Sequence, residues 1–557
     1  MQIVAVRYLA LATDYDGTLA FQGTVREETF AAVQRLRKSG RKPLLVTGRE
    51  LEDLQRVCPR LDLFDRVVAE NGALLYRPQT REEVVLAEAP PPELAERLRA
   101  RSIPISTGRV IVAMREPHQL EAVEVIRELG LELQVIFNKG AVMLLPSGVN
   151  KQTGLAVALR ELGLSQRNTV SIGDAENDHA MLAASECGVA VANALDALKE
   201  RADFVTRGAR GEGVEELIQL MVHDDLRSVV VARHALLLGM RRDGTEVHIA
   251  PAGRRVLVAG PSGSGKTTAA TGFLERIMGA GYQVCIIDPE GDYEGFDGVV
   301  GIGTGERAPS VEEVLELLQK PEVNAGVNLL GVSVQERPAF FAALLPRLQE
   351  MRSRVGRPHW IVIDEAHHLF PASWKPAPLT VPRELGGVLL VTVHPENISP
   401  AMMEAIDTVL AVGDAPERTL RRFGGAPPVE LEDGEVLAWS NGQIEPLRLV
   451  PGKAQHLRHR RKYAEGDVHE KAFVFRGPQG KLSLRAQNLS MFLQMAFGVD
   501  EDTWIHHLRH RDYSRWFRDA IKDEELAEEA ADIERRHPPH SREKMREAIE
   551  KRYTLPE

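Results

Sequence analysis

YLALATDYDGTL (residues 8–19) joins an apolar run to a loop that carries two carboxylates. The apolar run predicts a buried strand, and open α/β sheets carry their chemistry in the loops at the carboxyl ends of their strands. In such a loop Asp14 can attack phosphorus and form an aspartyl-phosphate that water then hydrolyses. Asp16 can protonate the leaving oxygen and later activate the water. The segment therefore predicts an α/β domain that performs phosphoryl transfer.

Three further segments follow in the order that this chemistry needs. Thr47 and Gly48 end a second apolar strand and offer a hydroxyl and an amide to a phosphoryl oxygen. Lys151 follows the apolar run 141–145 and can neutralise phosphate charge. The segment GDAEND (residues 173–178) follows another apolar run and offers oxygen ligands suited to Mg²⁺. Its candidate ligands are Asp174, Asn177 and Asp178.

With these four segments the chain resembles the haloacid dehalogenase superfamily over about residues 5–222, in the branch with an α/β cap of the Cof type (class IIB). The GDxxND form of the last segment and the position of the inserted stretch carry the subassignment. The resemblance implies Asp14 as nucleophile and Asp16 as acid/base, with Thr47 and Lys151 on the phosphate. It further implies that Asp14, the backbone carbonyl of Asp16 and Asp174 hold Mg²⁺, supported by Asn177 and Asp178.

A second phosphate-binding motif lies in mid-chain, between the apolar strand 256–259 and a helix-like run. Glycines let backbone amides converge on the phosphates of ATP, the lysine meets the β/γ oxygens and the first threonine can ligate Mg²⁺. The residues of this P-loop are Gly260, Pro261, Ser262, Gly263, Ser264, Gly265, Lys266, Thr267 and Thr268. Asp364 ends a second buried strand as a metal-orienting carboxylate, and Glu365 is placed to polarise a water for attack on the γ-phosphate.

Over about residues 230–450 the chain resembles the HerA/FtsK/VirB4-like ATPases, through the P-loop, the strand and loop 284–293 and the hairpin turn 239–244. His394 occupies the position from which a strand end senses the γ-phosphate, where a glutamine is more usual. Arg418, Arg421 and Arg422 are candidates for a finger that reaches a neighbouring subunit, although a solvated helix face is the simpler interpretation.

The alternation of strands and helices predicts an α/β fold of several domains, because single cores stop growing near about 250–300 residues. We expect a Rossmann-like phosphatase domain at 1–225 with a cap at about 79–148, and a P-loop ATPase domain at 226–451. A basic linker at 452–466 and a small, mainly helical domain at 467–557 follow. His506 and His510 stand four residues apart in the last domain and could bind a metal, although polar surface histidines explain them more simply.

Composition bounds the remaining expectations. The formal net charge of −11 argues against a protein that coats nucleic acid, although the basic run 453–462 leaves a local contact open. Cys58, Cys187 and Cys285 form no CxxC and predict no disulfide framework. No run approaches the length of about 18 apolar residues that a membrane span needs, and no signal peptide precedes the first strand. We expect a cytoplasmic enzyme.

These observations favour a Mg²⁺-dependent phosphomonoesterase for a small phosphorylated metabolite, such as a sugar phosphate, fused to an ATP-hydrolysing domain that regulates it. An end-healing kinase–phosphatase is an alternative, but Glu365 argues against it, because a kinase must exclude water. A ring-forming DNA motor is a third hypothesis, which the HerA resemblance favours and His394 weakens. ATP, the metabolite and a second copy of the chain are the expected partners; nucleic acid is open and a membrane is not expected.

Overall fold

The structure is a computed structural model that describes residues 7–370, 386–425, 429–432, 434–440, 442–452, 472–478, 480, 482–521, 523–536 and 539–553. The chain forms two compact units, Met1–Val450 and Pro451–Glu557. The first unit contains two large sheets with their helices and a small third sheet. It is an α/β structure, as the sequence predicts.

The first sheet has eight strands in the order β12-β11-β10-β1-β2-β3-β4-β5. Its strands are β1 (Ala10–Thr13), β2 (Lys42–Val46), β3 (Arg66–Ala69), β4 (Leu74–Arg77), β5 (Glu82–Val85), β10 (Thr169–Gly173), β11 (Cys187–Ala190) and β12 (Phe204–Val205). The strands from β12 to β3 are parallel, with Ala10 opposite both Thr169 and Lys42. Since β1 is central and parallel to β10 and β2, the loops after all three strands meet at one edge.

Helices cover this sheet: α1 (Glu27–Lys38), α2 (Leu51–Val57), α5 (Lys151–Glu161), α6 (His179–Ala184), α7 (Asp196–Lys199) and α8 (Gly211–Asp224). Helix α1 has glutamates in its first turn and basic residues in its last, which complements the helix dipole. It buries Phe30, Val33 and Leu36 and packs beside α8. The apolar faces of these helices and both faces of the sheet form one continuous core.

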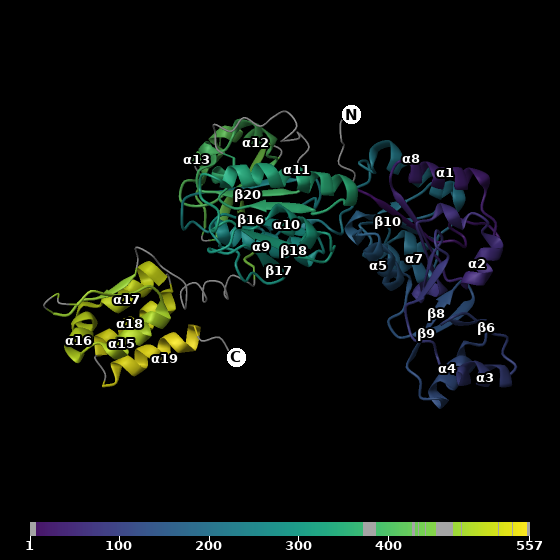
Figure 1. The fold of residues 1–557 in the computed structure, drawn as a ribbon, viewed down its shortest axis with the longest axis horizontal. Coiled ribbons are helices and arrows are strands. Elements are labelled where there is room, and N and C mark those ends of the chain that lie inside the picture. The colour runs from purple at the N-terminus through teal and green to yellow at the C-terminus, as the bar shows by residue number, and fades with distance from the viewer. Residues whose placement is uncertain are drawn as a thin grey trace. The chain divides into compact units, whose positions relative to one another are not determined.

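The inserted stretch folds as a separate four-stranded antiparallel sheet with two helices. Its elements are α3 (Pro92–Ala100), β6 (Ser106–Thr107), β7 (Val112–Arg115), α4 (Gln119–Glu128), β8 (Leu133–Asn138) and β9 (Ala141–Pro146), with the strand order β6-β7-β9-β8. Figure 1 shows α3 and α4 on the side of this sheet away from the eight-stranded core. The expected cap is therefore present as a small α/β layer.

The second large sheet has eleven strands in the order β14-β13-β23-β22-β21-β15-β20-β19-β16-β18-β17. They are β13 (Leu236–Met240), β14 (Glu246–Ile249), β15 (Arg255–Ala259), β16 (Val284–Asp288), β17 (Val299–Ile302), β18 (Asn324–Asn328), β19 (Trp360–Ile363), β20 (Val388–Thr392), β21 (Thr408–Ala411), β22 (Glu435–Ser440) and β23 (Gln443–Arg448). The seven strands from β21 to β17 are parallel, and the hairpins β13–β14 and β22–β23 extend one edge.

Helices lie on both faces of the eleven-stranded sheet. They are α9 (Lys266–Gly279), α10 (Val311–Leu318), α11 (Arg337–Val355), α12 (Pro400–Ala405) and α13 (Pro416–Leu420). Helix α9 packs Phe273 edge-on against Trp360, with ring centroids 5.5 Å apart. Helices α10 and α11 share a core with Leu257 and Ile361, whose side chains leave the sheet on the other face.

A buried polar interface joins the two large sheets within the first unit. The Glu186 carboxylate, with no exposed surface, forms an ion pair with Arg7 and accepts hydrogen bonds of 3.0 and 2.8 Å from the Tyr282 hydroxyl. His359 Nε2 lies 3.0 Å from the side-chain oxygen of Asn168. Asn168 directly precedes β10 and His359 directly precedes β19, so the carboxyl ends of both strands lie away from this interface.

The second unit contains the hairpin β24 (Phe473–Phe475) and β25 (Leu484–Ala486) and five α-helices among its described residues. These are α15 (Leu489–Gly498), α16 (Glu501–His510), α17 (Asp512–Trp516), α18 (Glu524–Arg536) and α19 (Ser541–Tyr553). Phe473, Phe492, Trp504 and Tyr513 form its aromatic core. The basic run 453–462 lies outside the described residues.

Candidate active sites on two sheets

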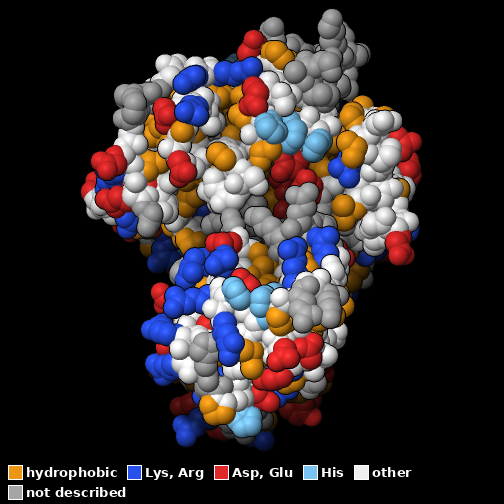
Figure 2. Space-filling view, turned by 90° about the vertical axis from the view of Figure 1, so that its left-hand side faces the viewer, with side chains coloured by type: hydrophobic (Ala, Val, Ile, Leu, Met, Phe, Trp, Pro, Cys, Tyr) orange, Lys and Arg blue, Asp and Glu red, His pale blue; other side chains and the backbone are white. Residues whose placement is uncertain are grey.

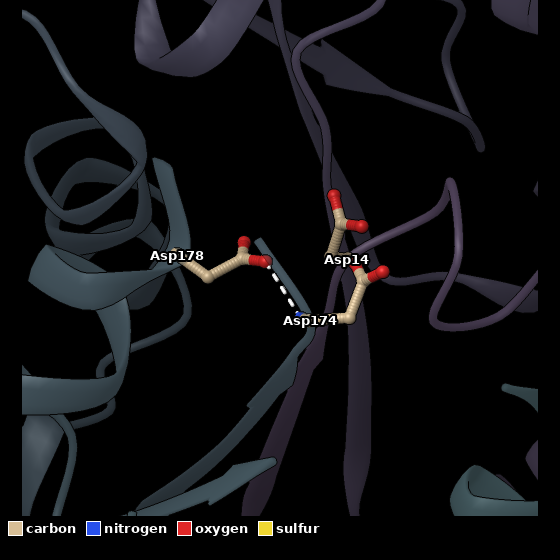
Figure 3. Close-up of side chains that lie close together, drawn as sticks. All are labelled: Asp14, Asp174 and Asp178. Atoms are coloured by element: carbon tan, nitrogen blue, oxygen red, sulfur yellow. Dashed lines mark hydrogen bonds between the residues drawn. The ribbon is translucent and has the colours of Figure 1, made fainter. Parts of the chain in front are cut away.

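The first site is built at the carboxyl edge of the eight-stranded sheet. Asp14 follows β1, and Asp174 and Asp178 belong to the loop after β10. Carboxylate oxygens of these three buried residues all lie within 4.8 Å of one another. Figure 3 shows Asp14 and Asp174 at the ends of adjacent strands and the Asp178 side chain pointing toward Asp174 from a separate segment. Since Mg²⁺ takes carboxylate oxygens as ligands, the donor set fits that ion.

Lys151 supplies the countercharge to this carboxylate group. It has no exposed surface, and its ammonium donates to Asp14 Oδ1 at 2.5 Å and to Asp178 Oδ1 at 2.6 Å. The side chain of Asn150 caps α5 by accepting from the Thr153 amide, and Thr153 bonds back to the Asn150 amide, so the capping box fixes Lys151 in the first turn. One buried cation thus bridges two of the three carboxylates.

Burial sets the protonation of this group. Burial raises the pKa of Asp14 to about 8, although Lys151 acts in the opposite direction. Burial also raises the pKa of Asp174. Burial by itself would lower the pKa of Lys151, but Asp14 and Asp178 outweigh it and the pKa rises. Lys151 is therefore charged at neutral pH, whereas Asp14 binds a proton easily at neutral pH even beside this ammonium.

The loop after β10 is held rigidly around the carboxylates. Asp178 Oδ2 accepts from the amides of Asp174 and Ala175 at 2.9 and 3.0 Å. The Thr18 hydroxyl donates to Asp174 Oδ1 at 3.1 Å. A Cβ at Gly17, whose φ is +84°, would lie 2.2 Å from Asp174 Oδ2, so only glycine fits beside this carboxylate. The DxDGT motif therefore needs its glycine for close approach as well as for the turn.

The other sequence-predicted residues take different places. Thr47 is buried, and its hydroxyl accepts from the Arg49 amide at 3.1 Å. The Asn177 amide donates to the Asn71 side chain at 2.9 Å, beside the carboxylate group rather than within it. The Asp16 carboxylate is outside the group of three and pairs with Arg49 through two hydrogen bonds of 2.5 and 2.7 Å.

The cap adds two contacts that the sequence analysis did not foresee. Glu70, from the loop after β3, accepts hydrogen bonds from the amides of Arg109, Val110 and Ile111 at 2.8, 2.7 and 3.0 Å, and so ties the cap to the core. Lys139, at the tip of the β8–β9 hairpin, brings its ammonium into contact with Asp174 Oδ2. Lys139 precedes Asp174 by a whole helix and two strands, so no local pattern indicates the contact.

The P-loop forms the second site, at the carboxyl end of β15. The loop turns through Gly263 and Gly265, with φ of +77° and +95°, directly into α9, whose first residue is Lys266. The Lys266 ammonium donates to the Pro261 carbonyl at 2.8 Å, and Thr267 follows it on the helix. Burial lowers the pKa of Lys266. Backbone amides at a helix start and a lysine beside them form an arrangement suited to phosphate.

Asp364 and Glu365 lie on the same edge of the eleven-stranded sheet, after β19. Burial raises the pKa of Asp364 to about 8, reinforced by Asp292. Burial and then Glu290 raise the pKa of Glu365. Glu365 takes a left-handed φ of +40°, which is uncommon for a residue with a side chain and is typical of functional loops.

Two histidines lie beside this carboxylate pair. His367 Nδ1 lies 3.0 Å from the Thr392 hydroxyl and 3.3 Å from Glu365 Oε2. His394, the predicted sensor, is half-exposed, with Nδ1 3.0 Å from Glu396 Oε1. In the upper body of Figure 2 histidine side chains lie beside acidic ones where the surface is hollowed. His367, which the sequence analysis did not single out, thus connects the loop after β19 with the last residue of β20.

The remaining candidates lie apart from both sites. Arg418, Arg421 and Arg422 are exposed at α13 and just after it. The His506 and His510 rings are tilted by 46° with their centroids 4.3 Å apart, but neither belongs to a three-ligand group within the described ranges. No helix among the described residues is both long and apolar enough to cross a membrane.

Comparison with known proteins places these features in context. Residues 11–101 and 103–218 match the haloacid dehalogenase-like hydrolase family, and residues 239–341 match the central domain of helicase HerA. The phosphoglycolate phosphatase of Methanothermobacter thermautotrophicus is 33% identical over 222 residues, which are 38% of this chain and 97% of the relative. The phosphoglycolate phosphatase of Archaeoglobus fulgidus is 31% identical over 218 residues, 38% of this chain and 96% of the relative.

A crystal structure of a haloacid dehalogenase-like hydrolase from Bacteroides thetaiotaomicron is similar at 20% identity and a TM-score of 0.34, over 38% of this chain and 99% of the other. The HerA match ends before Asp364 and Glu365. The match to the first family, by contrast, includes all three carboxylates of the first site.

Proposed function

The chain belongs to the haloacid dehalogenase-like hydrolases through residues 11–218, and on that premise we propose that it is a Mg²⁺-dependent phosphomonoesterase for a small phosphorylated metabolite. The observation that carries the proposal is the buried group of Asp14, Asp174 and Asp178 with Lys151 between two of them. A nucleophilic carboxylate, a metal site and a fixed ammonium are the parts that phosphoryl transfer through an aspartyl-phosphate requires.

In the proposed reaction an Asp14 carboxylate oxygen attacks phosphorus and the bond to the leaving oxygen breaks. Asp16 donates a proton to that oxygen and then accepts one from the water that hydrolyses the aspartyl-phosphate. Because Asp16 is paired with Arg49, this pair has to open for each proton transfer. Lys151 and Thr47 hold the phosphoryl oxygens, with the amide of Gly48 beside them.

Asp14, Asp174 and the backbone carbonyl of Asp16 would hold Mg²⁺, with Asp178 and Asn177 in support. The bound ion would spread the charge that develops on the phosphoryl oxygens. Asp178 would act mainly through its two backbone hydrogen bonds, which hold the loop of Asp174 in place.

The substrate class is the finer part of the proposal. The two relatives named above are phosphoglycolate phosphatases, and these favour a small phosphorylated acid as substrate. A sugar phosphate, the expectation from the sequence, is the competing class. A phosphorylated acid and a sugar phosphate are both small enough for a site beneath the cap. They differ in the charge of the leaving group, which is a carboxylate-bearing alcohol in the first and an uncharged sugar in the second.

We propose further that the region 226–451 binds and hydrolyses ATP and regulates the phosphatase. Lys266 and the surrounding loop (residues 260–268) would hold the phosphates, and Thr267 and Asp364 would orient Mg²⁺. Glu365 would polarise the attacking water, and His394 would respond to the γ-phosphate. The buried Glu186–Tyr282 contact supports coupling, because it ties the two sheets within one compact unit.

The proposed domain boundaries follow from this division. Residues 1–225 with the cap at about 79–148 would form the phosphatase, 226–451 the ATPase and 467–557 a helical domain after the linker 452–466. A nucleic-acid motor is the second candidate function, favoured by the match of residues 239–341 to the HerA central domain.

Phosphate release from a substrate panel tests these assignments. The panel contains phosphoglycolate, sugar phosphates, nucleotides and 3′-phosphorylated DNA, each with and without ATP. We expect a small phosphomonoester to be hydrolysed, Asp14→Asn to abolish this, and Lys266→Ala to change only its response to ATP. Turnover of DNA ends alone would overturn the metabolite phosphatase and favour the second candidate.

A further inference from the structure

A cap lysine contacts the catalytic carboxylates from the open side of the site. Lys139 and Gly140 form the two-residue turn between β8 and β9, where Asn138 pairs with Ala141. Their φ values of +47° and +83° are those of a tight hairpin turn that favours Asn-Gly or Gly-Gly. A lysine in this left-handed conformation carries a backbone cost, which indicates that its side chain serves a purpose at this position.

The position of the turn is fixed by the core as well as by the cap. The Lys139 amide donates to Glu176 Oε2 at 3.3 Å, which ties the turn to the loop after β10. A second contact fixes the cap sheet to the core: Glu70 accepts hydrogen bonds from the amides of residues 109–111, which lead into β7. Because β7 pairs with β9, this contact also positions the β8–β9 turn. Lys139 is therefore presented at a defined place rather than on a free loop.

The site has two ammonium groups with different surroundings. Lys151 is fully buried and both of its acceptors are carboxylates of the site. The side chain of Lys139 is 41% exposed and contacts a single carboxylate, that of Asp174, which is itself fully buried. One ammonium is thus committed to the group around Asp14, while the other reaches that group from the solvent side, beneath the cap.

Charges of both signs flank the turn: Arg115 pairs with Ala141 directly after it, and two glutamates lie nearby. Glu176 accepts from the Lys139 amide, and Glu116 Oε2 lies 3.8 Å from where a Cβ on Gly140 would be. With Mg²⁺ bound, Asp174 would no longer need the ammonium of Lys139 as its partner, and that ammonium could take another anion. We place the leaving group of a phosphoryl group bound at Asp14 on the open side of the site, from which the 41% exposed side chain of Lys139 reaches Asp174.

We propose that Lys139 is a specificity-determining residue that binds a carboxylate on the leaving group, so that the preferred substrate is a phosphorylated hydroxy acid. This inference rests on the proposed phosphatase function and extends it. An uncharged polyol offers the ammonium only hydroxyl acceptors, whereas a carboxylate forms a charge-assisted hydrogen bond with it.

The test compares two esters of equal length in the full chain with Mg²⁺: 2-phosphoglycolate and 2-hydroxyethyl phosphate, in which an alcohol replaces the carboxylate. For Lys139→Gln we expect the ratio of the two kcat/KM values, acid over alcohol, to fall about 10- to 100-fold, the loss of one charge-assisted hydrogen bond. Lys139→Arg should recover most of this ratio. Lys42→Gln is the matched control, because Lys42 forms a similarly exposed pair with Asp65 at 3.1 Å on the core sheet.

Binding measured without turnover gives a second readout. In the Asp14→Asn background, calorimetry should show that Lys139→Gln weakens binding of 2-phosphoglycolate far more than binding of 2-hydroxyethyl phosphate. An equal loss for both esters, or no loss, in an active enzyme overturns the inference and leaves the phosphatase function intact. If the wild-type chain hydrolyses no phosphomonoester, the proposed function and this inference fail together.

Discussion

Replacing Lys151 by methionine should separate the structural role of the buried ammonium from the chemistry around it. The side chain has no exposed surface and lies 2.5 and 2.6 Å from carboxylate oxygens of Asp14 and Asp178. Methionine fills a similar volume but leaves two buried carboxylates without their shared cation. Removing one partner of a buried ion pair costs about 3–5 kcal/mol. At pH 9, above the pKa of about 8 that burial gives Asp14, the free energy of opening around β1 and β10 should therefore fall by about that amount without metal.

Hydrogen exchange followed by mass spectrometry measures this locally, on peptides that cover β1 and β10, in the presence of a chelator. Lys139→Met is the matched control, since it removes an ammonium from the same carboxylate group at a 41% exposed position. A half-exposed pair contributes at most about 1 kcal/mol. Mg²⁺ at 100 times its dissociation constant should return about 2.7 kcal/mol to either variant, because it binds only the folded site.

The reasoning would be refuted by a loss below about 1 kcal/mol for Lys151→Met, or by equal losses in the two lysine variants. Either result would mean that the carboxylates are protonated or solvated in the metal-free protein. The buried ammonium would then have no part in holding the loop after β10 against β1.

Three further outcomes are expected. Because burial raises the pKa of Asp14 to about 8, binding of Mg²⁺ below that pH has to release a proton from Asp14. The affinity of the protein for Mg²⁺ should therefore rise about tenfold per pH unit from pH 6 to 8 and then level off. An affinity that calorimetry finds to be independent of pH contradicts this. Glu365→Gln should retain binding of a fluorescent ATP analogue but reduce ATP turnover about 10²–10⁴-fold, which is the usual contribution of a general base. Unchanged turnover would show that Glu365 is not the general base. Gly72→Ala should lower the free energy of thermal unfolding by more than about 2 kcal/mol, since its Cβ would lie 2.0 Å from the Asn150 carbonyl oxygen. Gly148 also has a positive φ but has open space around it, so Gly148→Ala should cost only the backbone strain. Equal losses of stability in the two variants would refute the clash.

Much of the fold was predictable because the signals are local. Buried parallel strands read as short apolar runs, so β2, β10 and β15 lie within a residue or two of the runs that predict them. The first catalytic loop was predictable for the same reason: Asp14 and Asp174 each directly follow such a run. Strands of one parallel sheet bring their carboxyl ends to a single edge, and this rule joins residues far apart in the chain.

The contacts that cross between layers were not predictable in this way. The pairing of Arg49 with Asp16 depends on how two loops fold over one strand edge. The contact of Lys139 with Asp174 depends on where the cap lies on the core. Arg49 and Lys139 are each an ordinary charged side chain in a polar segment. Their distance along the chain from Asp16 and Asp174 does not indicate that these pairs meet.

The sequence by itself determined the strand–loop–helix units and the two phosphate-binding loops, because apolar runs, glycines and carboxylates at fixed spacing act within a few residues. Only the tertiary structure decided which charges meet. It buried Lys151 between Asp14 and Asp178, brought Lys139 of the cap to Asp174, and joined the two sheets through Glu186 and Tyr282. Such pairs form when separate layers pack, and the free energy of a charge depends on the burial and partners that this packing creates.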